Sequence, residues 1–308
     1  MEKDIVSIKI NNLKSQSSLL IRERIERVAN LKNSLLLIGE TGVGKDFWAE
    51  YILYKSNYDK FVNLHCGDVP ESLLYSEWFG YKKGAFTGAD SDYEGKWAKA
   101  DGGILFLNQI DLLSINLQAR LLRIIERKKY FPLGCTRERE IDVKFIFSVD
   151  NDIEERVKNG TFRADLFYRI SPFIVNVLPL RERKEDVFAL LKYFATKNRI
   201  GLSLSDKGIK IINNYNWMGN IRELENFVNR AAVINNSVSD KDAFTLVENS
   251  DAFLNMEIKQ EKTLKDLEYE YIKYLIKKYK NKSKVSEILN ISRKSLYDKI
   301  ARYESDNI

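Results

Sequence analysis

A glycine-rich segment near the start of the chain has the residue types and spacing of a phosphate-binding loop. It consists of Gly39, Glu40, Thr41, Gly42, Val43, Gly44, Lys45 and Asp46. Glycines let the backbone fold tightly, so that successive N–H groups face a phosphate at the start of a helix, and the lysine reaches the β- and γ-phosphates. The generic pattern has Ser or Thr after the lysine as a magnesium ligand, where this chain has Asp46. The alternative is a strand-to-helix turn that binds no nucleotide.

A second segment has the position of an acidic site but lacks its carboxylates. Phosphate chemistry normally uses two carboxylates after a later buried strand, one to hold magnesium and one to polarise the attacking water. The apolar run 102–107 ends instead in two amides, Asn108 and Gln109. Taken alone, this pair indicates no function.

The segment from Asn281 to Ile300 is typical of two helices joined by a tight turn. Val285, Ile288 and Leu289 give the first helix an apolar face. Asn290 and Ile291 suit the turn, and Ser292 is a good N-cap for the second helix. The exposed start of such a second helix is the part that enters the major groove of DNA.

The charge of this segment supports the same interpretation. Between residues 281 and 302 we count six basic and two acidic side chains, which is +4 of the chain's net +6. The candidate DNA contacts are Lys282, Lys284, Ser292, Arg293, Lys294, Ser295, Tyr297 and Lys299. Phosphate contacts by the lysines would make binding strongly salt-dependent. The alternative is a solvated basic face without a partner.

Composition excludes several classes of function. With one histidine, His65, a His-based metal site or a Ser-His-Asp triad is not expected. Only Cys66 and Cys135 occur, so no disulfide framework is present and a reducing cytoplasm is the simplest location. No apolar run approaches the ~20 residues of a membrane-spanning helix, and we expect no membrane partner.

The elements that must position these residues alternate between strand and helix. Buried-strand patterns at 34–38, 61–64, 104–107 and 143–149 are separated by helical patterns such as 19–29 and 113–126. This alternation predicts an α/β fold with a parallel sheet between helices. After residue 178 the patterns are helical, at 184–197, 206–215 and 220–234. We therefore expect an α/β domain over 1–178, a helical unit over 179–238, a linker over 239–262 and the basic helical domain over 263–308.

Several motifs in a fixed order resemble those of the AAA+ activators of sigma-54 RNA polymerase, the bacterial enhancer-binding proteins. The hexapeptide Gly84-Ala-Phe-Thr-Gly-Ala89 is close to diagnostic. The other motifs that match are Gly39–Asp46, Glu77–Gly80, Leu117–Leu122, Phe162–Ile170, Leu180–Asp186 and Trp217–Leu224. The similarity runs from about residue 19 to the end. It implies an AAA+ P-loop domain, a helical lid and a Fis-like helix-turn-helix.

The resemblance implies roles for residues that spacing alone does not assign. Gly84, Ala85, Phe86, Thr87, Gly88 and Ala89 match the loop that contacts sigma-54. Arg163 and Arg169 match the paired arginines that reach the nucleotide of a neighbouring subunit, which implies a ring, usually a hexamer, of this chain or of this chain with a paralogue. Arg222 matches the lid arginine that senses the γ-phosphate. ATP and Mg²⁺ are the implied cofactors, and enhancer DNA the implied partner.

The chain departs from the family pattern around the nucleotide. Family members have Asp-Glu, the Walker B pair, at Asn108-Gln109 and an asparagine at His65. Their sensor asparagine aligns with Asp150, although Asn151 is adjacent, and Met218 replaces a proline. An amide is a poor magnesium ligand and cannot accept a proton, and general-base help is worth about 10²–10⁴ in rate. We therefore expect weakened magnesium coordination and ATP binding with slow hydrolysis.

The chain also begins almost directly at the AAA+ unit, which suggests that it lacks the N-terminal regulatory domain of most family members. Two hypotheses follow. The chain is either a DNA-bound activator that remodels sigma-54 RNA polymerase, or a non-hydrolysing regulatory subunit in a hetero-oligomer with an intact paralogue.

Overall fold

The computed structural model describes residues 10, 13–67, 70–246, 264–279, 281–289 and 291–305. The chain forms two compact units, residues 1–247 and 248–308, and each is described by itself. Within the described residues, no helix is long and apolar enough to cross a membrane.

A five-stranded parallel sheet with the order β2-β3-β6-β1-β7 lies at the centre of the larger unit. Its strands are β1 Leu35–Ile38, β2 Phe61–His65, β3 Ile104–Asn108, β6 Lys144–Val149 and β7 Phe173–Asn176. Both faces are covered, as expected for a parallel sheet. Along β1, Leu35 and Leu37 belong to one core cluster and Leu36 to the other. The parallel α/β fold predicted from the sequence is confirmed, while β7 was not among the predicted strands.

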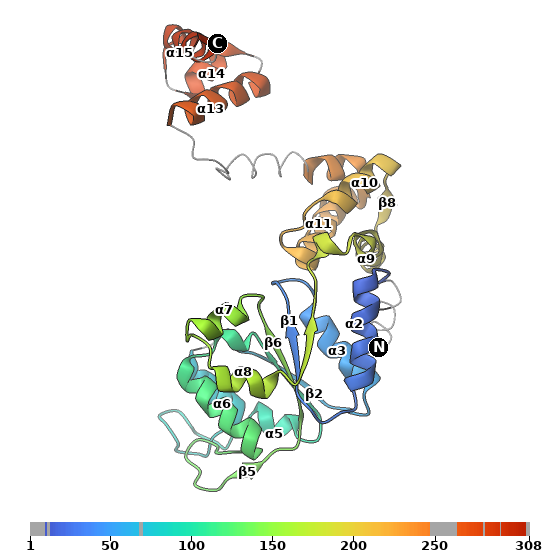
Figure 1. Cartoon of the computed structure of the whole chain (residues 1–308), viewed down its shortest axis with the longest axis vertical. Helices are drawn as coiled ribbons and strands as arrows, with labels where there is room; N and C mark the ends of the chain where they lie inside the picture. Colours follow the sequence, from blue (N-terminus) through green and yellow to red (C-terminus); the bar gives the residue numbers. More distant parts are fainter. Residues whose placement is uncertain are drawn as a thin grey trace. The chain divides into compact units, whose positions relative to one another are not determined.

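Helices pack on both faces of this sheet (Figure 1). One face carries α2 Gln16–Val28 and α3 Lys45–Lys55. The other carries α4 Glu71–Phe79, α5 Lys96–Ala100, α6 Ile115–Arg127, α7 Ile153–Lys158 and α8 Ala164–Ile170. The short helix η1 Ile110–Leu112 follows β3, and the hairpin β4 Lys129–Tyr130 with β5 Arg139–Glu140 follows α6.

The helical part of the larger unit follows β7. It contains η2 Leu180–Glu182, α9 Lys184–Lys197, α10 Asp206–Asn214 and α11 Asn220–Asn235. A small parallel sheet, which the sequence did not predict, pairs β8 Gly201–Ser203, between α9 and α10, with β9 Ser237–Ser239, which follows α11.

The structure differs from the prediction at the start of the expected linker, residues 239–262. Residues 240–246 are helical, and Ala243 and Leu246 are buried in the same core cluster as α9 and α11. The helical part therefore continues beyond residue 238. The rest of the expected linker, from residue 247, lies outside the described residues.

In the smaller unit, the described residues form a cluster of the helices α13 Leu264–Tyr279, α14 Lys282–Ile288 and α15 Arg293–Ser305. Ile272, Leu275, Val285 and Leu296 form its buried core. Asn281 caps α14 by accepting from the backbone N–H of Ser283, and the Ser292 hydroxyl accepts from Ser295 at 3.0 Å, as predicted for an N-cap. The predicted turn residue Asn290 lies outside the described residues.

Candidate functional site

The phosphate loop lies between the end of β1 and the start of α3. Gly42 and Gly44 have φ values of 81° and 100°, a region that favours glycine. A Cβ on Gly42 would lie 2.6 Å from the carbonyl oxygen of Gly219, so the loop also needs glycine there for space. Lys45 is buried, and its ammonium donates to the carbonyl oxygens of Gly39 and Glu40. The ammonium thus lies within the curve of the loop, where the motif predicts it.

Several residues that the sequence singled out lie close enough to Lys45 to change its pKa. Burial lowers the pKa of Lys45, while the charges of Asp150, Asp111 and Asp46 raise it and Arg222 lowers it further. Asp111 is buried, and burial raises the pKa of its carboxyl. Arg222 also lies beside the loop, because a Cβ on Gly42 would be 3.4 Å from its Cβ. Arg222 is therefore at the phosphate loop.

Asn108 is buried at the end of β3 and is held by three neighbours. Its amide nitrogen donates to Asp46 Oδ1 at 2.7 Å and lies 3.4 Å from His65 Nδ1. Its amide oxygen accepts from the Ser148 hydroxyl. Because a carboxylate can only accept, the contact with Asp46 fixes which end of the amide points at the loop.

Gln109 begins a turn after the strand. Its backbone is left-handed, with φ 60°, and its N–H donates to Ser148 Oγ at 2.9 Å. Thr41 Oγ1, in the phosphate loop, donates to Asp150 Oδ2 at 3.5 Å. The positions where the sequence departs from the family pattern (Asn108, Gln109, His65 and Asp150) thus lie around the phosphate loop.

These residues can accommodate a magnesium ion only in part. In the portion of the chain that the structure describes, no group of three His, Cys, Asp or Glu side chains could hold a metal alone. A nucleotide-bound Mg²⁺ does not need such a cage, because it keeps waters and takes one or two carboxylates together with phosphate oxygens. The exposed carboxylate of Asp46 suits this role, whereas the amide of Asn108 is already used by Asp46 and Ser148.

Side chains from the helical part hold the phosphate loop, and sequence reasoning did not single them out. Arg181 makes two hydrogen bonds to the Glu40 carboxylate, at 2.8 and 2.5 Å, and these lower the pKa of Glu40. The Asn220 amide donates to Glu40 and to the carbonyl of Thr41, each at 3.1 Å. The buried Arg183 donates to the carbonyl of Val43 at 2.5 Å. In the sequence, these residues stand out only because they belong to the motifs 180–186 and 217–224.

The hexapeptide forms a tight loop, closed by a hydrogen bond from Gly84 N to the Ala89 oxygen at 2.9 Å. Gly84 and Gly88 have φ values of 82° and 95°, and a Cβ on either would meet no atom within 4 Å. Phe86 is 45% exposed, and its ring centroid lies 4.9 Å from that of Tyr81. The loop therefore presents an aromatic side chain at the surface.

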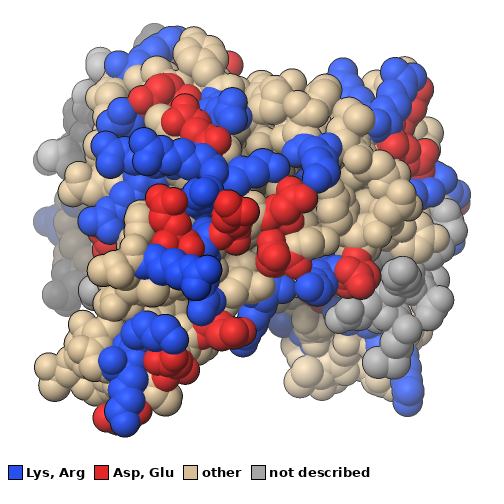
Figure 2. Space-filling view, turned by 90° about the horizontal axis from the view of Figure 1, so that it is seen from below, with Lys and Arg blue, Asp and Glu red and all other residues tan. Residues whose placement is uncertain are grey.

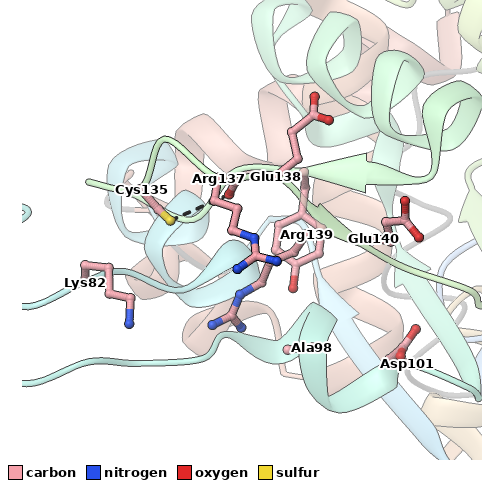
Figure 3. Close-up of a pocket in the computed structure, with 9 residues that line it drawn as sticks. Lys82, Ala98, Asp101, Cys135, Arg137, Glu138, Arg139 and Glu140 are labelled. Atoms are coloured by element: carbon pink, nitrogen blue, oxygen red, sulfur yellow. Dashed lines mark hydrogen bonds between the residues drawn. The ribbon is translucent and has the colours of Figure 1, made fainter.

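A second loop supports the base of the hexapeptide loop. Tyr81 pairs with Tyr93 and with Leu133, and a Cβ on Gly134 would lie 2.8 Å from that of Ala85. Beside this contact is an open cavity of about 500 Å³, into which Lys82, Arg137 and Arg139 extend (Figure 3). The base of the hexapeptide loop and the segment before β5 thus form one surface with several cations.

The two expected ring arginines lie away from the phosphate loop. Arg163 is paired with Asp165, at 2.7 Å between Nη2 and Oδ2, and Arg169 lies in the last turn of α8. In the described parts of the chain, neither arginine contacts Lys45 or Asn108. The geometry does not assign them a role within their own subunit's site.

The charged side chains of the smaller unit include most of the candidate DNA contacts. Lys282, Arg293, Lys294 and Tyr297 are exposed, and the Lys282 ammonium lies 4.7 Å from the Tyr297 ring centroid. Ile288 is also exposed, at 42%, so it is not part of the predicted apolar face. Figure 2 shows instead the end of the larger unit that carries β5, and on that face Lys and Arg side chains lie among Asp and Glu side chains. The positions of the basic side chains are therefore more informative about a DNA-binding surface than the net charge of the chain.

Comparisons with known proteins identify the family of the chain. Three sequence families match in order: "Sigma-54 interaction domain" over residues 12–176, "AAA+ ATPase lid domain" over 181–247 and "Bacterial regulatory protein, Fis family" over 263–303. The first match covers more than half of the chain.

Curated relatives include two transcriptional regulators. The anaerobic nitric oxide reductase transcription regulator NorR of Aliivibrio fischeri is 42% identical over 227 residues, which are 71% of this chain and 44% of that protein. The phenol regulator MopR of Acinetobacter guillouiae is 36% identical over 292 residues, which are 88% of this chain and 52% of that protein. The chain thus spans about half the length, or less, of these relatives.

Among solved structures, NtrX from Brucella abortus in complex with ADP is similar, with a TM-score of 0.71 and 25% identity. The match covers 94% of this chain and 68% of NtrX. The fold, the phosphate loop, the hexapeptide loop and the ordered family matches lead to one conclusion. The chain belongs to the sigma-54-dependent transcriptional activators of the AAA+ class.

Proposed function

We propose that this chain binds ATP and enhancer DNA and acts on sigma-54 RNA polymerase through the loop Gly84–Ala89, promoting open-complex formation. The exposed Phe86 at the tip of an otherwise compact loop supports this role. The buried Lys45 and the glycine conformations support nucleotide binding. The exposed cations of α14 and α15 support DNA binding.

The observation that carries the proposal for slow hydrolysis is the placement of Asn108. It occupies the position of a Walker B carboxylate, yet its amide nitrogen donates toward the phosphate loop. Gln109 follows it, and an amide cannot take a proton from an attacking water. The arginines Arg163 and Arg169 are proposed to act on the site of a neighbouring subunit in a ring, usually a hexamer.

Single-turnover ATP hydrolysis tests this proposal. The double variant Asn108→Asp with Gln109→Glu is expected to hydrolyse ATP about 10²–10⁴ times faster than the natural chain, which corresponds to roughly 2.7–5.4 kcal/mol in the barrier. Lys45→Ala in both backgrounds is the control and should abolish turnover. Equal rates for the natural chain and the double variant would contradict the proposal.

A second candidate function is favoured by the same amide pair. The chain would then be a non-hydrolysing subunit that binds DNA and ATP and regulates an intact paralogue in a mixed ring. Open-complex formation on a sigma-54 promoter distinguishes the two functions. Full activity of the purified chain alone supports the activator, whereas activity that requires added paralogue supports the regulatory subunit.

A further inference from the structure

Two arginines extend from the hairpin of β4 and β5 into the open cavity beside the hexapeptide loop (Figure 3). In the antiparallel pairing of β4 with β5, Arg139 lies opposite Tyr130, so the two side chains are on the same face of the hairpin. Because successive residues of an extended chain point to opposite faces, Arg137 shares this face with Arg139. The two guanidinium groups therefore enter the cavity together.

The neighbouring carboxylates are engaged elsewhere. Glu138 and Glu140 pair with Lys129 on the other face of the hairpin, at 3.9 and 3.1 Å. Asp101 lines the cavity, but its Oδ1 accepts the backbone N–H of Asp142 at 2.8 Å. Among the ion pairs of the described residues, none includes either of the two arginines. The cavity therefore offers positive charge to an anion that comes from outside the chain.

The lining of the cavity fits the phosphates of a nucleic acid better than a segment of protein. Six of its nine lining residues are charged, and the other three are Ala98, Tyr130 and Cys135. The core of a protein–protein interface is apolar and depleted of charged residues, whereas an interface with DNA is polar and positively charged. The planar guanidinium of arginine also binds a phosphate through two parallel hydrogen bonds.

Backbone hydrogen bonds join this cavity to the hexapeptide loop. Lys82 N donates to the Leu133 oxygen at 3.0 Å, and Leu133 N donates to the Gly80 oxygen at 2.9 Å. Lys82 also lines the cavity, and its ammonium is paired with Asp92. The exposed Phe86 of the hexapeptide loop offers the apolar contact that suits a protein and that the cavity lacks. The two adjoining surfaces thus suit two chemically different parts of one assembly.

We propose that Arg137 and Arg139 bind the phosphate backbone of promoter DNA while the hexapeptide loop engages sigma-54. This inference rests on the proposed function and adds a DNA-binding surface in the larger unit to the one proposed for α14 and α15. Contacts to phosphates carry no sequence information directly but fix the position of a protein on the duplex. The arginines would therefore hold the DNA in a fixed position relative to the hexapeptide loop.

Cys135 allows a probe to be placed in the cavity itself, because the other cysteine, Cys66, is buried. The full chain is labelled at Cys135 with a photoreactive aryl azide and irradiated with sigma-54 RNA polymerase on promoter DNA, in the presence of a non-hydrolysable ATP analogue. Retention of polymerase by the immobilised chain is measured in parallel. For the natural chain, we expect the label to crosslink to DNA.

Substitutions on the two faces of the hairpin test the role of the arginines. Arg137→Gln with Arg139→Gln should reduce crosslinking to DNA by about 10-fold, because charge-assisted hydrogen bonds to phosphate are lost. Arg137→Gln alone, at an exposed position, should cause part of this loss. Lys129→Gln is the matched control, since it removes a cation from the other face of the hairpin, and it should crosslink fully. Retention of polymerase should be the same in all of these variants.

The molecule that the label reaches decides the outcome. Crosslinking to sigma-54 instead of DNA would indicate an acidic protein segment in the cavity and would overturn the proposal. DNA crosslinking that survives the double substitution, or that is lost equally in Lys129→Gln, would also overturn it. A natural chain that retains polymerase but crosslinks to neither partner would refute the DNA contact and leave the proposed function standing. A chain that retains no polymerase would refute the proposed function, and this inference with it.

Discussion

Replacing Asp186 by alanine is expected to destabilise the larger unit strongly. Asp186 is fully buried and accepts four hydrogen bonds near the start of α2. Its Oδ1 accepts from the backbone N–H groups of Lys14 and Ser15, at 2.7 and 2.8 Å, and its Oδ2 accepts from the hydroxyls of Ser15 and Ser18, at 2.7 and 2.6 Å. The guanidinium of Arg183, itself 1% exposed, lies 3.9 Å from Oδ2.

The expected magnitude follows from what the substitution leaves behind. Burial already lowers the pKa of Arg183 to about 10, and Asp186 is the charge that opposes this shift. Removing one partner of a buried ion pair typically costs about 3–5 kcal/mol, because the other charge stays buried and uncompensated. For a unit of this size, each kcal/mol lowers Tm by roughly 2–4 °C, so the loss is about 6–20 °C.

Urea unfolding followed by tryptophan fluorescence measures this effect in the intact chain. All four tryptophans, Trp48, Trp78, Trp97 and Trp217, belong to the larger unit, so the signal reports on that unit.

Two further variants separate the buried pair from a general loss of charge. Combining Asp186→Ala with Arg183→Met should cost less than the sum of the single losses, because no unpaired charge remains. The control is Glu225→Ala, which breaks the more exposed pair with Lys197 and should cost about 1 kcal/mol or less. A loss for Asp186→Ala as small as that of the control would refute the reasoning.

Three other predictions concern the pH dependence of stability, DNA binding and the hexapeptide loop. Burial lowers the pKa of Lys144 from 10.5 to about 8, so the unfolded chain holds more protons between these pH values and stability should rise by up to about 3 kcal/mol over that range. Urea unfolding at pH 7.5 and 10 should show this rise in the natural chain but not in Lys144→Met; an equal rise in both would contradict it. If Lys282, which lies over the Tyr297 ring, contacts a phosphate, Lys282→Ala should reduce the salt slope of DNA affinity by about 0.9; an unchanged slope in fluorescence anisotropy would count against that contact. Gly134→Val places a side chain against Ala85 at a backbone φ of 69°, costing about 1–3 kcal/mol of local strain. It should impair open-complex formation on a sigma-54 promoter but leave ATP affinity unchanged, and unimpaired open complexes would show that the contact is dispensable.

Much of the framework could be predicted because it depends on local pattern. The helix expected at 184–197 is α9 with the same bounds, and β1, β3 and β6 match their predicted runs to within a residue. In contrast, the short apolar run Phe173–Val175 was not recognised as a strand, and β7, at the edge of the sheet, buries only Val175 of its four residues. The helix at 240–246 buries only Ala243 and Leu246, too few positions to show a helical period.

The site was predicted in its residue types but not in its contacts. The glycines and Lys45 follow a spacing that the backbone conformation requires, and this is readable in the sequence. The contact of Asp46 with Asn108 joins residues 62 positions apart, and that of Arg183 with Val43 joins residues 140 apart. Such pairs depend on strand order and on the packing of the helical part, which local patterns do not encode.

The hydrogen bonds from the helical part to the phosphate loop connect two equilibria: the binding of a nucleotide and the orientation of α11. Besides the side-chain contacts, Ile221 N donates to the carbonyl of Gly42 at 3.0 Å, so backbone from α11 is joined to backbone that faces the phosphates. A nucleotide that shifts this loop must also shift the preferred orientation of α11. By thermodynamic reciprocity, any macromolecule that fixes that orientation changes nucleotide affinity by the same factor. If ATP binds as proposed, this contact would couple nucleotide affinity to the orientation of α11 without any phosphate bond being broken.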